Sequence, residues 1–288
     1  MLSFKTILFP VDFSDRCKGA AHFVQAIASG SGSKVILLNV LETATAYPGD
    51  LDFGALSTST YAEDRAATAE EHLQNFVVEE LSGLEVERRV ELGDPAGTIV
   101  RVAQDEHVDL IMMPTHGYGG FRRFILGSVT AKVLHDAQCP VWTGAHLNDA
   151  SGPVEPIKSV VCALDLTESS DAPFAAAIEL AAKHGAKLTI THAVPGTDAI
   201  PEKLMDMEFR QHLITEAKRR IDAMLAPAAV QAGVCIESGD VHKVVTSCAK
   251  SHKADLVVIG RARHSGFGRL RTHSYAIIRE SPCPVISL

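Results

Sequence analysis

The sequence predicts an α/β protein made of two copies of one domain, each with a parallel sheet covered by helices on both faces. The chain has 288 residues, and at roughly 150 residues per domain this length suits two domains. The segment that begins at Gly93, GDPAGTIVRVAQDEHVDLIMMPTH, recurs in altered form from Gly239 as GDVHKVVTSCAKSHKADLVVIGRA. Within each copy, short apolar runs alternate with stretches of helical periodicity, as in parallel strands joined by helices.

The first copy contains five apolar runs that predict strands and four amphipathic stretches that predict helices. The expected strands are Thr6–Val11, Val35–Val40, Val86–Leu92, Asp109–Met113 and Pro140–Thr143. The third of them alternates apolar and charged residues, which is typical of an edge strand. Helices are expected to begin at Ser14 or Asp15 and end near Gly30, and to cover Ala66–Val77, Ala96–Ala103 and Ser128–Leu134.

The second copy repeats this order of elements. Its expected strands are Val160–Leu164, Leu188–Ala193, Val234–Glu237, Leu256–Ile259 and Val285–Leu288, and its long helix is expected to stop before Pro227. Between the copies, a polar segment rich in turn formers predicts a linker. The expected domains are therefore residues 1–146 and 157–288, joined by a linker over 147–156.

Composition and charge argue against several classes of protein. The net charge is −8, from 35 acidic and 27 basic residues, whereas a nucleic-acid binder normally shows a basic face. The longest apolar runs are strand-sized, so we expect no contact with a membrane. Because Asp12 interrupts the first apolar run, no signal peptide is expected. The six cysteines include no CxxC pair, which favours a reducing, cytoplasmic location.

The loop after the fourth strand is the strongest candidate for a binding site. It reads Pro114-Thr-His-Gly-Tyr-Gly-Gly-Phe-Arg-Arg-Phe-Ile-Leu-Gly-Ser-Val129. Its glycines let the backbone come close to a ligand above the sheet, and Gly127-Ser128 opens a helix. The free N–H groups and positive dipole end of a helix start suit a phosphate. A plain glycine turn followed by an ordinary serine cap explains the same residues equally.

Several motifs together resemble the universal stress protein family: VDFS after the first strand, LLNV in the second, GDPAGTI, and THG followed by LGSV and CPV. The similarity covers both copies and identifies the chain as a tandem member. The resemblance implies that each domain is adenine-nucleotide-hydrolase-like (Rossmann-like), with a five-stranded parallel sheet of order 3-2-1-4-5. It also implies that the two domains pair within the chain as a pseudo-dimer.

The resemblance also implies a ligand. Members that bind ATP carry G-x2-G-x9-G-[ST] after strand 4, and the first copy keeps this spacing with proline in place of the first glycine. In the family, the residue matching Asp12 and the backbone at Val40 hold adenosine. Mg²⁺ would be carried by the phosphates of ATP and not by protein ligands. The expected site comprises Asp12, Val40, Pro114, His116, Gly117, Gly127, Ser128 and Val129.

The second copy departs from this pattern. Arg263 and His273 stand where the second and third glycines are expected, and replacing glycines that need a positive φ weakens binding. The arginines of this segment can grip an anion with their side chains, or can form a basic loop that is solvated or paired with acidic groups of the other copy. The expected second, weaker site comprises Asp165, Ala193, Gly260, Arg263 and Ser274.

These residues predict a stress-response protein that binds one ATP, or a related adenine nucleotide, in its first domain. A nucleotide-independent interaction protein with a vestigial cleft is the alternative, and Pro114 favours it. A slow ATP hydrolase would share the pocket, but no pair of nucleophile and base points to catalysis. The 13 histidines show no HxxxH or HExxH pair, so no metal bound by protein ligands is expected. The internal pairing of domains fits both a monomer and a homodimer.

Overall fold

The computed structural model describes residues 4–42, 55–116, 126–145, 154–195, 207–261 and 269–288, with only the backbone described at 55–62, 168 and 269–272. The strands are β1 (Thr6–Pro10), β2 (Lys34–Leu41), β3 (Glu85–Leu92), β4 (Leu110–Pro114), β5 (Val141–Gly144), β6 (Ser159–Ala163), β7 (Lys187–Val194), β8 (Gly233–Ser238), β9 (Leu256–Ile259) and β10 (Val285–Ser287). The helices are α1 (Asp15–Ser29), α2 (Ala55–Asn75), α3 (Pro95–Asp105), α4 (Ser128–Asp136), α5 (Asp171–His184), α6 (Met207–Ala228), α7 (Val241–Ser251) and α8 (Arg269–Glu280).

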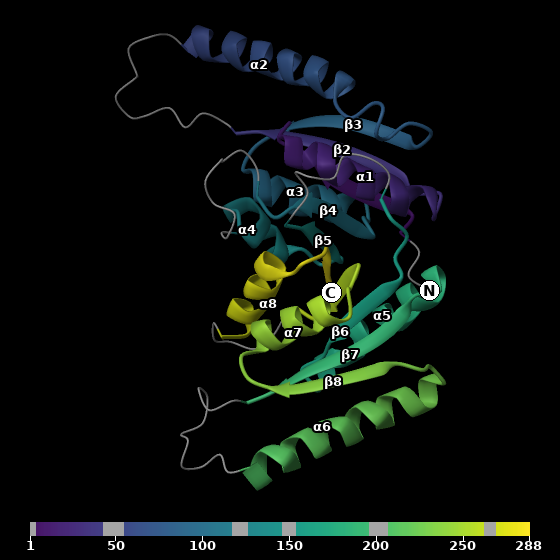
Figure 1. The fold of residues 1–288 in the computed structure, drawn as a ribbon. Helices are drawn as coiled ribbons and strands as arrows, with labels where there is room; N and C mark the ends of the chain where they lie inside the picture. The colour runs from purple at the N-terminus through teal and green to yellow at the C-terminus, as the bar shows by residue number, and fades with distance from the viewer. Residues whose placement is uncertain (1–3, 43–54, 117–125, 146–153, 196–206, 262–268) are drawn as a thin grey trace.

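The strands form one sheet of ten, in the order β3-β2-β1-β4-β5-β10-β9-β6-β7-β8. Each half therefore has the expected order 3-2-1-4-5, and its described strand pairs are parallel. The expected α/β fold is confirmed, and Figure 1 shows the sheet running through both halves. The predicted linker, 147–156, lies mostly outside the described residues, so the domain boundaries stay a prediction.

The two halves join through β5 and β10, which pair in the antiparallel direction. Thr143 lies opposite Val285, and Val141 lies opposite Ser287. Two buried hydroxyls add to this seam: Thr143 Oγ1 donates to the Val285 carbonyl at 3.4 Å, and Ser287 Oγ donates to the Val141 carbonyl at 3.3 Å. The pairing within the chain is thus a continuous sheet and not a contact between two separate sheets.

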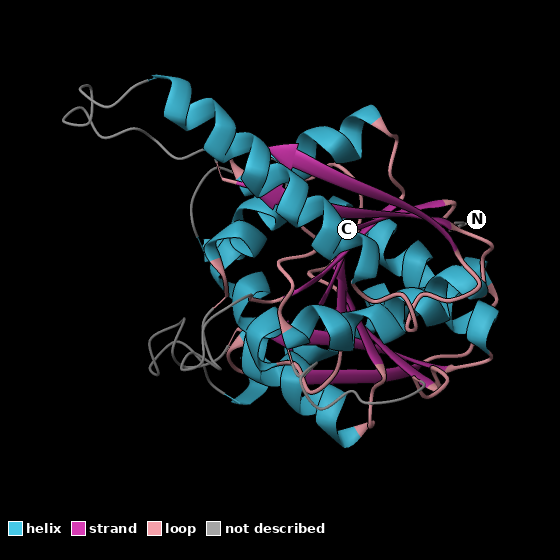
Figure 2. Cartoon of the chain, turned by 90° about the horizontal axis from the view of Figure 1, so that it is seen from above, coloured by secondary structure: helices cyan, strands magenta, loops and turns pink. Residues whose placement is uncertain are grey.

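Both faces of the sheet are covered, which explains why the inner strands read as unbroken apolar runs, unlike the edge strands β3 and β8. Ile7 and Phe9 of β1 point to the side that packs α1, α2, α5 and α6, whereas Leu8 points to the side that packs α3, α4, α7 and α8. Figure 2 shows these helices on either side of the strands. Among the described residues, no helix has the length and apolar character needed to cross a membrane.

The two halves repeat each other in backbone conformation as well as in sequence. Phe13 after β1 and Leu166 after β6 both adopt a positive φ, of 65° and 58°. Gly93 and Gly239, each following the third strand of its half, have φ of 150° and 152°. A positive φ costs a non-glycine residue free energy, so its recurrence at matching places shows that the same turns are built twice.

Helices α4 and α8 meet at the seam through hydrogen bonds from the second half to the first. The Tyr275 hydroxyl donates to the Ala131 carbonyl at 2.9 Å. The Arg261 guanidinium donates to the carbonyls of Leu134, at 3.1 Å, and Cys139, at 2.5 Å. Because arginine keeps its charge at all physiological pH values, the carbonyls of Leu134, in the last turn of α4, and of Cys139, after that helix, accept charge-assisted hydrogen bonds.

The expectation that the long helix of the second half stops before Pro227 is wrong. Helix α6 runs to Ala228 and contains the proline. A proline removes one backbone donor from a helix and crowds the preceding turn. Only one residue of α6 follows Pro227, so the cost falls on the last turn, where helix hydrogen bonds already fray.

Gly93 and Gly32 offer a matched pair for testing the strained turn after β3. Gly93 has φ +150°, and a Cβ there would lie 2.7 Å from Thr98 Oγ1, whereas Gly32 has φ +61° and no atom within 4 Å of such a Cβ. We expect Gly93→Ala to lower the free energy of unfolding by about 3 kcal/mol and Gly32→Ala by about 1 kcal/mol. Urea unfolding measures both, and equal losses would show that the contact with Thr98 relaxes.

Candidate functional site

The candidate site of the first half lies at the carboxyl ends of three strands, beside the start of α4. Strand β1 lies between β2 and β4. Helix α1, which follows β1, covers one face of the sheet, whereas α4, which follows β4, covers the other. Ligands of parallel α/β sheets bind at such switch points. Of the predicted residues, Gly117 lies outside the described residues, and the structure brings to this edge Asp12, Val40, Pro114, His116, Gly127, Ser128 and Val129.

Asp12 is exposed, and its carboxylate is held in the turn that leads into α1. Its Oδ1 accepts hydrogen bonds from the Ser14 amide at 3.0 Å and from Cys17 Sγ at 3.2 Å. Burial, followed by the charge of Asp12, raises the pKa of Cys17 to about 12, so the thiol stays protonated and serves as the donor. Asp12 therefore stabilises the turn, and its hydrogen bonds with Ser14 and Cys17 also fix the orientation of its side chain at the sheet edge.

The end of β2 is tied to β1 by a residue that the sequence analysis did not single out. Asn39 is buried, and its Nδ2 donates to the Val11 carbonyl at 2.8 Å. The Asn39 Oδ1 atom is also buried and has no hydrogen-bond partner among the described residues. Val40 follows it, half-buried and opposite Glu91 of β3. A lone amide in the apolar run VILLNV was the available signal, because such a side chain needs a partner when buried.

The start of α4 is pressed against the end of β4. The Gly127 amide donates to the Thr115 carbonyl at 2.8 Å, so it is not available to a ligand. A Cβ on Gly127 would lie 3.3 Å from that carbonyl oxygen and from the His116 Cα, which explains the glycine by close packing. The next two amides, of Ser128 and Val129, have no acceptor among the described residues.

Side chains around β4 complete the connection. Thr130 Oγ1 of α4 donates to the Pro114 carbonyl at 3.1 Å, and Thr115 Oγ1 lies 2.9 Å from His116 Nδ1. Burial, with a smaller effect of the Arg16 charge, holds the pKa of the half-buried His116 below its usual value. The ring is therefore neutral at pH 7. The described residues contain no group of three potential metal ligands.

The second half has a cavity of about 200 Å³ at the equivalent place. Of the five predicted residues, Arg263 lies outside the described residues, and the cavity is lined by the other four, Asp165, Ala193, Gly260 and Ser274. His192 and His273 line it as well. His192 takes the place of Asn39, and its Nδ1 lies 2.7 Å from the Leu164 carbonyl.

The carboxylate of Asp165 is held by several groups of its own turn. Its oxygens accept from the Thr167 amide and hydroxyl at 3.0 and 2.8 Å, from Ser170 Oγ at 2.7 Å and from Ser169 Oγ at 3.2 Å. Burial acts to raise the pKa of Asp165, but these hydrogen bonds outweigh it and hold the pKa below its usual value. The carboxylate is thus committed to its own turn.

The helix after β9 begins earlier than its counterpart. Helix α4 starts at Ser128, whereas α8 starts at Arg269 and places Ser274, the match of Ser128, inside the helix. Amides within a helix bond to carbonyls of the preceding turn, so Ser274 presents no helix start to the cavity. Arg261, at the start of this arginine-rich segment, bonds to backbone carbonyls of the first half, and the expected pairing of the segment with acidic groups stays a prediction.

Comparison with known proteins gives a consistent result over the whole chain. The model of the universal stress protein family matches residues 3–143 and 156–287. Universal stress protein MJ0577 of Methanocaldococcus jannaschii is 30% identical over 151 residues, 48% of this chain and 93% of that protein. The crystal structure of a universal stress protein from Archaeoglobus fulgidus shares the fold, with 22% identity, a TM-score of 0.69 and coverage of 99% of this chain and 98% of its own.

One further structure is a universal stress protein in complex with cAMP. It is 23% identical and covers 48% of this chain and 94% of its own. Its TM-score of 0.31 is too low for its ligand to place a site in this chain.

The hydrogen bonds to Asp165 predict an acid-sensitive contribution to stability. Because the folded pKa of Asp165 lies below its usual value, the unfolded chain binds the proton more readily. The stabilisation is present above the unfolded pKa, about 3.9, and is lost as the pH falls through the folded pKa. Asp165→Asn should therefore reduce the loss of stability on acidification.

Urea unfolding between about pH 3 and pH 6 measures this effect. Asp222→Asn is the control, because it removes one exposed carboxylate of α6 without touching the Asp165 turn. The same pH dependence in both variants would contradict a special contribution from Asp165.

Proposed function

The chain belongs to the universal stress protein family, and we propose that its first half binds ATP, with Mg²⁺ on the phosphates, as the ligand of a stress-response regulator. The observation that carries this proposal is the start of α4. There the amides of Ser128 and Val129 lack an acceptor among the described residues, beside the ends of β1 and β4. Unsatisfied amides and the positive end of a helix dipole are the features that bind phosphate.

The energy available at this helix start is sufficient to matter. A hydrogen bond to a charged oxygen contributes about 1.5–3 kcal/mol. The two amides and the exposed Ser128 hydroxyl together supply a large part of the roughly 8 kcal/mol that micromolar affinity needs. Contacts with the nucleoside must supply the rest and offset the cost of ordering the ligand.

We assign the nucleoside to the ends of β1 and β2, with Asp12 near the ribose and the Val40 backbone near the base. The turn that holds Asp12 gives the carboxylate a fixed direction, which reduces the entropy lost on binding. Pro114 ends β4 without an amide to donate, and its carbonyl already accepts from Thr130. His116 and Gly117 complete the proposed site on the loop side.

We infer one nucleotide per chain. In the second half, the Ser274 amide lies within α8 and the Asp165 carboxylate is occupied by its own turn. The cavity there, about 200 Å³, is smaller than the roughly 300–1,000 Å³ of common ligand pockets. The second half then serves as the fixed partner of the first, in a protein that we place in the cytoplasm.

A second candidate is a nucleotide-independent interaction protein. It is favoured by the contact of Gly127 with Thr115 and His116, which explains the glycine at this position by packing alone. Identification of the small molecule released when freshly purified protein is denatured separates the two candidates. An adenine nucleotide supports the first candidate, and a different anion at this site supports the second.

Ser128→Ala should weaken ATP binding by about 1–3 kcal/mol, or about fivefold to 150-fold, through loss of a hydroxyl bond to phosphate. Ser274→Ala is the matched control, because the equivalent serine lies inside α8. Isothermal titration calorimetry should show about one site in the wild type and unchanged binding in the control. Two equal sites would contradict the inferred asymmetry, and unchanged affinity of Ser128→Ala would place the phosphates elsewhere.

A further inference from the structure

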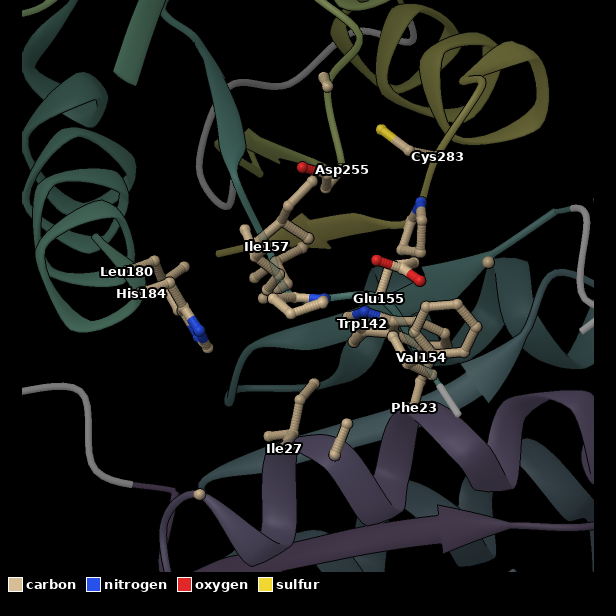
Figure 3. A pocket seen from close by; sticks show the side chains of 18 of the residues that line it. Phe23, Ile27, Trp142, Val154, Glu155, Ile157, Leu180, His184, Asp255 and Cys283 are labelled. Atoms are coloured by element: carbon tan, nitrogen blue, oxygen red, sulfur yellow. The ribbon is translucent and has the colours of Figure 1, made fainter. Parts of the chain in front are cut away.

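A cavity of about 650 Å³ lies between the two halves, apart from both clefts described above. Phe23 and Ile27 of α1 form one wall, and Leu180 of α5 forms the opposite wall. Trp142 of β5 and Ile286 of β10 lie at its base. Figure 3 shows Phe23, Ile27 and Leu180 around the cavity, with Val154 and Ile157 near Trp142. The volume is within the range of common ligand pockets.

The cavity follows from how the two faces of the seam are covered. On one face, α4 and α8 meet through the Tyr275 hydroxyl and cover β5 and β10. On the other face, α1 and α5 flank the same strands, and the segment Val154–Ile157 passes between them. The rings of Phe23 and Trp142, with centroids 5.1 Å apart, fill part of the gap. The space left over is mostly apolar.

A positive charge marks the rim of this cavity. The Lys183 ammonium, at the end of α5, donates to Ser31 Oγ of the first half at 2.6 Å. Ser31 is neutral, and Lys183 forms no ion pair with a carboxylate of the described residues. His184 stands beside it, and Figure 3 shows its ring on the α5 side of the cavity. An ammonium held in place by a neutral hydroxyl can accept an anionic partner.

Each of the two carboxylates of the lining has a partner other than Lys183. Asp255 Oδ2 accepts from the amides of Lys158 and Ser159 at 2.7 and 2.9 Å, which fixes the start of β6. Glu155 has a side chain that is 84% exposed, and it lies 3.7 Å from Lys158 Nζ. Neither carboxylate forms an ion pair with Lys183, so the Lys183 ammonium remains the group at the rim that can pair with an anionic ligand.

We propose that this seam cavity, defined by Phe23, Ile27, Trp142, Leu180 and Lys183, binds an amphipathic monocarboxylate with a medium-length hydrocarbon chain. The hydrocarbon chain of the ligand lies against the apolar walls of the cavity and removes them from water, which contributes about 25 cal/mol per Å² of buried apolar surface. The carboxylate lies at the rim beside Lys183. This site is independent of ATP, because none of its residues belongs to the cleft at the start of α4.

The chain contains a single tryptophan, Trp142, and its fluorescence reports occupancy of the cavity directly. Titration with decanoate, kept below its critical micelle concentration, should give a saturable change in Trp142 fluorescence. Decanol should bind more weakly and decylammonium most weakly, because only the carboxylate pairs with Lys183. The absence of any saturable change, or stronger binding of decylammonium, would overturn the proposal.

Two pairs of variants separate the cavity from the rest of the surface. Ala26→Phe places a ring in the cavity and should weaken decanoate binding about tenfold or more, whereas Ala182→Phe, on an exposed position of α5 outside the lining, should not. Lys183→Gln should weaken decanoate about fivefold and leave decanol unchanged, as for one exposed ion pair. Lys187→Gln is its control.

Equal effects of Ala26→Phe and Ala182→Phe would show that decanoate binds outside the cavity, and the proposal would fail. The Ser128→Ala variant should keep the wild-type response to decanoate, so a failure of the nucleotide proposal leaves this test intact.

Discussion

The close contact between Gly127 and the end of β4 is the constraint on which the candidate site depends. Because a Cβ at Gly127 would lie 3.3 Å from the Thr115 carbonyl oxygen and the His116 Cα, any larger residue there would have to push α4 away from the end of β4. The amides of Ser128 and Val129 then lie at the sheet edge without acceptors among the described residues. In the second half His273 takes this place, and α8 already begins at Arg269. The half with histidine in place of this glycine thus also has a helix that starts earlier, at Arg269.

The two halves share their turns and differ in how their polar groups are satisfied. The same positive φ follows the first strand of each half, and an aspartate precedes it in both. The partners of Asp12 include an amide and a thiol, and those of Asp165 include an amide and three hydroxyls. Each carboxylate is held by the turn that follows its strand, with different side-chain donors in the two halves.

Local patterns predicted most of the fold. Strand β9 matches its expected range, and the other strands differ by one residue at one or both ends. The inner strands are easy to locate because apolar runs buried on both faces are unbroken. The family resemblance supplied the strand order. The bonds of Arg261 and the seam cavity could not be predicted, because they depend on atoms from the other half. For the site, the spacing of the glycines located the start of α4 at Ser128. The earlier start of α8, at Arg269, could not be predicted from that spacing because it depends on how the helix packs.

The bonds from Arg261 and Tyr275 to α4 run in one direction across the seam. At the matching positions the first half has Thr115 and Val129, which have neither a guanidinium nor a phenol to return them. A dimer of identical subunits must make each interface contact twice. Covalent fusion of the two halves removes that requirement. Each half can therefore acquire different side chains at the seam, while the pairing between the halves is kept.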